Sequence, residues 1–113
     1  MTRDLQRGDI PTLILAVLQG GALHGYGIAR AVSELSENAL QLREGALYPA
    51  LRSLEEQHLV ESTWEVQPSG PARRVYRLTT AGEAAVLERA RQWETYVHAV
   101  SKVLGKGRIQ HAE

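Results

Sequence analysis

The sequence predicts a mainly α-helical fold with one small β-hairpin, of the α+β class, and three observations lead to it. Leu47, Leu51 and Leu54 recur at i, i+4 and i+7, which places them on one face of a helix. Residues 60–66 and 73–79 predict two short strands around a Pro-Ser-Gly-Pro turn. A long amphipathic segment follows the hairpin. This order is typical of a winged helix-turn-helix with a long C-terminal helix.

The composition is that of a single globular domain. The chain has 113 residues, enough for one modest core. Hydrophobic residues make up 43% and charged residues 23%, and no apolar run approaches the about 20 residues of a membrane span. The N-terminal stretch MTRDLQRGDIPT lacks the apolar core of a signal peptide. We therefore expect a cytoplasmic protein that does not enter a membrane.

The charge is balanced overall but unevenly distributed. The formal net charge is 0, from 13 basic and 13 acidic residues, which weighs against nucleic-acid binding because such domains are usually basic. From residue 66 to residue 82, however, no acid occurs, and Arg73, Arg74 and Arg77 lie inside this stretch. Positive charge is therefore expected to gather on the hairpin.

No pattern in the sequence indicates a catalytic or metal centre. The chain has no cysteine, and its four histidines are scattered without an HxxxH spacing. No Ser/His/Asp arrangement or convergent carboxylate pair is recognisable. We expect no enzyme activity, no metal and no cofactor.

The N-terminal half predicts two helices. In the helix over residues 8–19, Asp9 is the expected cap and Pro11 lies in the first turn. Residues 13–18 are almost all apolar, so in a chain this small we expect a second chain to cover part of this helix. We expect a second helix over residues 24–36, which Asn38 should close. Its expected inward-facing residues are Ile28, Ala31, Val32 and Leu35.

A brief edge strand over residues 40–43 and a helix over residues 44–57 are expected next. Pro49 falls inside this helical pattern and removes a backbone hydrogen bond. We therefore expect the regular helix to begin close to Pro49, or to bend there.

The helix over residues 80–104 should begin at Thr80, the expected cap, with Glu83 completing a capping box. An apolar seam with heptad spacing runs along it, formed by Val86, Ala90, Trp93, Val97, Val100 and Leu104. Its length, about 37 Å, exceeds what the rest of the domain needs. We expect a DNA-binding domain over residues 1–79, a dimerisation helix over 80–105 and a flexible tail over 106–113.

Four strings in this order resemble the PadR family of bacterial transcriptional regulators. They are HGYG at residues 24–27, GALYPAL at 45–51, LE at 54–55 and YRLTTAG at 76–82. The resemblance covers about residues 8–104, and the single C-terminal helix is similar to that of the shorter members. Where the family usually has glycine after the third helix, this chain has His58, at a turn that favours left-handed backbone.

The resemblance implies a homodimer on a palindromic double-stranded DNA operator, with half-sites about 34 Å apart. It also implies a repressor that a small aromatic or drug-like effector releases from DNA. The helix over residues 80–104 would pack against its mate and against the first helix of the partner. The expected dimer contacts are Leu13, Val17, Val86, Ala90, Trp93, Val97, Val100 and Leu104. The expected effector contacts are Trp93, Tyr96 and Val97, although Trp93 fits a purely structural dimer contact equally well.

The expected DNA contacts combine the third helix, the hairpin and the start of the second helix. They are Tyr26, Ala46, Tyr48, Pro49, Arg52, Ser53, Arg73, Arg74 and Tyr76. Arg52 also fits an ion pair with Glu55 or Glu56, and adjacent Arg73 and Arg74 point to opposite faces in a regular strand. Trp64 is expected to pack on the hairpin.

Two other functional classes fit the same sequence. One is a winged-helix protein-interaction module that binds no DNA, which the zero net charge favours. The other is an effector-binding protein with accidental DNA affinity. Salt dependence separates DNA binding from the first class, because phosphate contacts release counterions.

Overall fold

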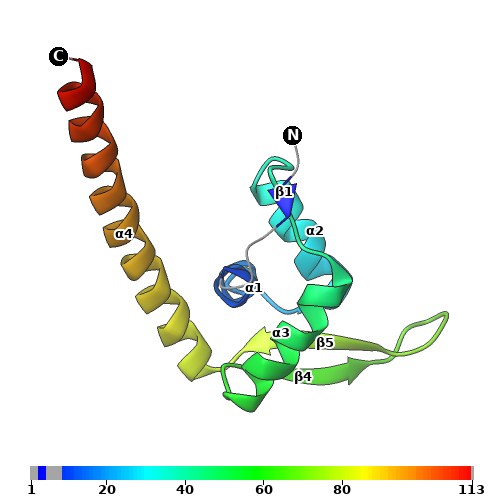
Figure 1. Cartoon of the computed structure of the whole chain (residues 1–113). Helices are drawn as coiled ribbons and strands as arrows, with labels where there is room; N and C mark the ends of the chain where they lie inside the picture. Colours follow the sequence, from blue (N-terminus) through cyan, green and yellow to red (C-terminus); the bar gives the residue numbers. More distant parts are fainter. Residues whose placement is uncertain (1–2, 5–8, 113) are drawn as a thin grey trace.

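The computed structural model describes residues 3–4 and 9–112, and its described side chains are those of residues 9–106. The helices are α1 (Ile10–Leu18), α2 (Gly25–Leu35), α3 (Glu44–Glu56) and α4 (Thr80–Ala112). The strands are β1 (Arg3–Asp4), β2 (Leu23–His24), β3 (Leu40–Gln41), β4 (Val60–Glu65) and β5 (Arg73–Leu78). Figure 1 shows the helical body, the β4–β5 hairpin projecting from it and α4 standing beside it. The predicted winged helix with a long C-terminal helix is confirmed.

Two small sheets support the helices. β2, β5 and β4 form an antiparallel sheet in that order, and β1 pairs in parallel with β3. The predicted edge strand is therefore present as β3. The strand β2, which the sequence did not reveal, adds a third strand to the hairpin. A single core lies between α1, α2, α3 and this sheet. Its buried members are Ile10, Ile14, Leu15, Leu18, Ile28, Val32, Leu42, Leu47, Leu51, Leu54, Val60, Tyr76 and Val86.

Helix α3 is built as the leucine periodicity predicts, but it starts earlier than expected. Leu47, Leu51 and Leu54 are all buried. The helix begins at Glu44 rather than near Pro49. The N–H groups of Ala46 and Leu47 bond to the carbonyl of Arg43, so the first turn closes without the N–H that proline lacks.

His58 ends α3 in the left-handed conformation expected of that position, with φ 61°. The His58 N–H bonds to the Glu55 carbonyl at 2.9 Å and the Leu59 N–H to the Leu54 carbonyl at 3.0 Å. These two bonds form a Schellman motif. At the end of α2, Asn38 also has positive φ, and its side chain accepts a bond from the Ser33 hydroxyl, so it closes that helix as predicted.

The start of α4 differs by one residue from the prediction. Thr79, rather than Thr80, is the cap: its Oγ1 accepts from the Gly82 N–H at 3.0 Å. The same hydroxyl donates to the His58 carbonyl at 2.7 Å, which ties α4 to the end of α3. At α1 the expected cap is absent, since the Asp9 side chain forms no capping hydrogen bond.

Helix α4 leaves the domain after its first turns (Figure 1). It continues to Ala112, past the expected end at Leu104 and through most of the predicted tail. Every described side chain from residue 90 to residue 106 is exposed. The radius of gyration is 17.1 Å, against about 13 Å for a compact chain of this length. The molecule is elongated because α4 extends beyond its own domain after its first turns.

Two predicted burial positions are wrong. Leu35 of α2 is 75% exposed instead of facing inward. Val86, expected at a dimer contact, is buried in the core of its own chain, because the first turns of α4 still pack on the domain.

Candidate nucleic-acid interface

The exposed face of α3 carries the side chains that the sequence assigns to it. Tyr48 is 44% exposed, and Pro49, Arg52 and Ser53 are exposed, while Ala46 is half-buried. Ser53 receives a hydrogen bond from Gln57 Nε2 at 3.1 Å. This face is opposite the buried leucines, so it is the accessible face of α3.

Arg52 does not form the ion pair with Glu55 or Glu56 that the sequence also allowed. Among the described residues neither Glu55 nor Glu56 pairs with it. Glu55 instead accepts from the Ser62 hydroxyl at 2.8 Å and from Arg74 Nη2 at 3.3 Å. The Arg52 guanidinium is therefore uncommitted within the described chain.

Arg73 and Arg74 point to opposite faces of β5, as strand geometry requires. Arg74 Nε donates to Ser62 Oγ at 2.8 Å, and its guanidinium carbon lies 5.9 Å from the ring centroids of both Trp64 and Tyr76. Arg74 thus joins the hairpin to α3 through Glu55. Trp64 is 68% exposed, so it contributes to the hairpin mainly through this arginine.

Arg73 lies on the other face, beside His24 at the end of β2. Its Nη1 atom is 3.1 Å from His24 Nε2. Arg77, on the same face, donates to Glu61 Oε1 at 2.8 Å. Among the described residues, no carboxylate pairs with Arg73. Two arginines of the acid-free stretch are therefore paired with acids, Arg74 with Glu55 of α3 and Arg77 with Glu61 of β4. Arg73 is the arginine of this stretch that stays available.

The start of α2 adjoins this arginine. His24 is the N-cap residue, and its Nδ1 accepts from the Gly27 N–H at 3.2 Å. Tyr26 is 68% exposed and stacks on His24, with ring centroids 6.1 Å apart and planes 4° apart. The Tyr48 hydroxyl packs on Gly25 so closely that a Cβ there would overlap it. Tyr48 therefore brings the exposed face of α3 against the start of α2.

Tyr76 belongs to the core rather than to the contact surface predicted for it. It is 5% exposed, and it lies on the face of β5 that packs into the core. Burial raises the pKa of its hydroxyl, and the nearby Arg74 charge opposes that rise. The sequence could not separate this tyrosine from the exposed ones, because the difference depends on which face of β5 packs into the core.

The apolar seam of α4 lies open along the helix. Trp93 is 55% exposed and contacts Tyr96 at a ring-centroid distance of 5.9 Å. Ala90, Val97, Val100 and Leu104 are also exposed, and Leu13 and Val17 of α1 are half-buried. All these residues except Val86 are thus available for the dimer contact expected of them.

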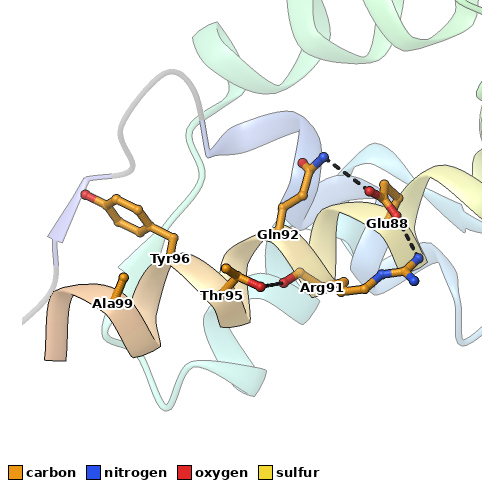
Figure 2. A pocket seen from close by; sticks show the side chains of 6 residues that line it. All are labelled: Glu88, Arg91, Gln92, Thr95, Tyr96 and Ala99. Carbon is orange, nitrogen blue, oxygen red and sulfur yellow. Dashed lines mark hydrogen bonds and ion pairs between the residues drawn. The ribbon is translucent and has the colours of Figure 1, made fainter. Parts of the chain in front are cut away.

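A shallow hollow lies on α4, and Figure 2 shows its lining side chains along one face of the helix. The lining residues are Glu88, Arg91, Gln92, Thr95, Tyr96 and Ala99. Of the three expected effector contacts only Tyr96 lines it, and Trp93 and Val97 do not. Glu88 bonds to Arg91 at 2.6 Å and to Gln92 at 3.4 Å across the hollow. One chain therefore does not assemble the predicted effector site.

The described residues include no group of three or more His, Asp or Glu side chains placed to hold a metal ion. No helix within the same part of the chain has the length and apolarity to cross a membrane.

Comparison with known proteins identifies the family. The model of the transcriptional regulator PadR-like family matches residues 14–88. Transcriptional regulator Rv3488 of Mycobacterium tuberculosis is 38% identical over 98 residues, covering 87% of this chain and 88% of the relative. A PadR family transcription regulator from Clostridium difficile is 31% identical, with a TM-score of 0.76 over 86% of this chain and 99% of that one.

A second solved structure agrees. A PadR family transcriptional regulator from Eggerthella lenta is 31% identical, with a TM-score of 0.74 over 87% of this chain and 83% of that one. The match covers the winged helix, in a family of transcriptional regulators with a winged-helix DNA-binding fold. The chain belongs to the PadR-like family of transcriptional regulators.

Proposed function

We propose that the protein is a homodimeric repressor that binds a palindromic operator in the cytoplasm and is released by a small aromatic effector. The exposed face of α3 is the observation that supports the proposed DNA-contact surface. It presents Tyr48, Pro49 and Arg52 on a helix whose leucines are buried. Arg73 lies beside His24, next to the Gly25 on which Tyr48 packs. In this geometry α3 enters the major groove and the hairpin lies along the neighbouring backbone.

The exposed apolar seam of α4 supports the proposed dimer. Its apolar side chains from Ala90 to Leu104 are exposed in the single chain, and each buried Val or Leu contributes about 1.5–3 kcal/mol. A second copy of α4 is the partner that fits, because two helices with the same heptad spacing of apolar residues pack their seams against each other. The twofold pairing then sets the separation of the two α3 helices.

The proposed effector site requires that pairing. The indole of Trp93 and the ring of Tyr96 lie together on α4, and two copies would enclose a flat aromatic molecule between them. Such a ligand would change the separation of the two α3 helices. Because both α3 helices must bind their half-sites at once, a small change in the distance between them removes most of the avidity and releases the repressor.

The test is a fluorescence-anisotropy titration against the chain's own upstream DNA and a scrambled duplex, at three salt concentrations. We expect tight, sequence-preferring binding that weakens steeply with salt. Arg52→Ala should weaken binding about tenfold, since arginine contacts to bases or phosphates contribute about 1–3 kcal/mol. Arg91→Ala, which removes an arginine already paired with Glu88 on α4, is the matched control and should bind as the wild type does.

Equal, weak and salt-insensitive binding to both duplexes would contradict this proposal. It would favour the alternative of a winged-helix protein-interaction module. Normal operator binding by Arg52→Ala would overturn the placement of α3 in the groove.

A further inference from the structure

The His24 ring carries a donor that has no acceptor in the described structure. Its Nδ1 atom accepts from the Gly27 N–H at 3.2 Å. A neutral imidazole has one N–H and one acceptor nitrogen, so from this bond we assign the proton of the ring to Nε2. The Arg73 Nη1 atom, which is also a donor, lies 3.1 Å from Nε2. Two N–H donors thus converge with no acceptor between them.

The fold holds these two donors together. His24 pairs with Val75 in the β2–β5 ladder, so its side chain lies on the same face as that of Arg73. Capping of α2 fixes the ring at Nδ1, and the parallel Tyr26 ring covers one face of it. Glu65 is the cross-strand neighbour of Arg73, but no ion pair joins them.

We propose that His24 and Arg73 together bind one oxyanion, a non-bridging oxygen of a DNA backbone phosphate. His24 Nε2–H and the Arg73 guanidinium both donate to it, and the arginine supplies the charge that strengthens the bonds. The inference rests on the proposed DNA binding and adds His24 as a ligand of the nucleic acid. Such a contact fixes the register of the protein on the duplex without reading its sequence.

The competing role for His24 is that of a helix cap alone. Two variants separate the roles, because the amide of Asn matches the Nδ1 edge of imidazole and the amide of Gln matches the Nε2 edge. His24→Asn keeps a good cap and loses the distal donor, whereas His24→Gln keeps a distal donor and loses the cap.

The experiment measures DNA affinity and Tm for both variants. We expect His24→Asn to bind operator and scrambled DNA about tenfold more weakly, with an unchanged Tm. His24→Gln should bind about as well as the wild type and melt about 4 °C lower. In the background of Arg73→Gln, the additional loss from His24→Asn should shrink, because the two donors share one phosphate. Wild-type affinity for His24→Asn, or an equal loss in both variants, would overturn the inference.

A second measurement does not depend on DNA. The ¹⁵N shifts of the His24 imidazole in the free protein should show the Nε2–H tautomer. A proton on Nδ1 would mean that Nε2 accepts from Arg73, which would remove the site while leaving the proposed function standing. If the wild type itself binds no DNA in a salt-dependent way, the proposed function fails, and this inference fails with it.

Discussion

Arg73 and Arg74 are neighbours in sequence but have different roles in the structure. Arg74 is held by Ser62 and Glu55 and lies against two aromatic rings. Its ion pair is about half exposed at the arginine, so it contributes at most about 1 kcal/mol to stability. Arg73 has no carboxylate partner among the described residues. At the scale of single residues, the positive hairpin therefore divides into one cation that positions the hairpin and one that is available to a phosphate.

Tyr76 gives a pH prediction at the same scale. Burial raises the pKa of its hydroxyl, so the fold favours the neutral form. The stabilisation is fully present below the unfolded pKa of about 10 and is lost as pH rises through the folded pKa. We expect the free energy of unfolding to fall more steeply above pH 10 in the wild type than in Tyr76→Phe, as measured by urea unfolding from pH 7 to pH 11.

At pH 7 the Tyr76→Phe variant should have nearly wild-type stability, since the phenol and the phenyl ring bury almost the same apolar surface. Its DNA affinity should also be unchanged, because Tyr76 lies in the core. Identical alkaline behaviour of the two proteins would contradict the assignment.

At the scale of elements, the start of α4 packs closely on the residues that follow α3. Gly82 lies on the Leu59 backbone carbonyl, and a Cβ there would overlap that oxygen. Thr79 caps α4 and donates to the His58 carbonyl beside it. The direction in which α4 leaves the domain is therefore set by backbone groups, which cannot move aside as a flexible side chain can.

Gly82→Ala should therefore destabilise the protein by about 2–3 kcal/mol, the cost of overpacking a tight contact. Gly105→Ala is the matched control. It lies in the same helix with nothing within 4 Å of its would-be Cβ, and it should stabilise the helix by about 0.5–1 kcal/mol. Urea unfolding at one protein concentration measures both changes, and wild-type stability of Gly82→Ala would contradict this account of the contact.

The elements also show what the sequence could and could not predict. Periodicity placed Leu47, Leu51 and Leu54 correctly because it is a local property of one helix. The cap at Thr79 was missed by one residue because two threonines are adjacent and only the path of the preceding strand distinguishes them. The Arg74–Glu55 tie was missed because it joins residues 19 apart in sequence. His24 was predicted only as part of the HGYG string and not as a metal ligand. Its role as a helix cap was missed because histidine is not among the usual N-cap residues, which are Ser, Thr, Asp and Asn.

At the scale of the whole molecule, the shape itself requires an explanation. The described chain measures 66 × 31 × 21 Å, and α4 accounts for the elongation. A helix exposed on all sides is marginally stable in water, and most helical stability comes from packing of an apolar face. The seam from Ala90 to Leu104 therefore needs a partner, and a second copy of α4 is the partner that we propose. The same pairing would fix the distance between two copies of α3 and two copies of the His24–Arg73 site.

The most direct test is a hydroxyl-radical footprint of the protein on its own upstream DNA. The account predicts two symmetric protected patches about 34 Å apart, one for each half-site. Val97→Asp, which puts a charge on the seam, should abolish the paired protection at the same protein concentration, whereas Thr95→Asp, on the opposite face of α4, should preserve it. A single unsymmetrical patch, or a paired footprint that survives Val97→Asp, would contradict the claim that a dimer held by α4 binds the operator.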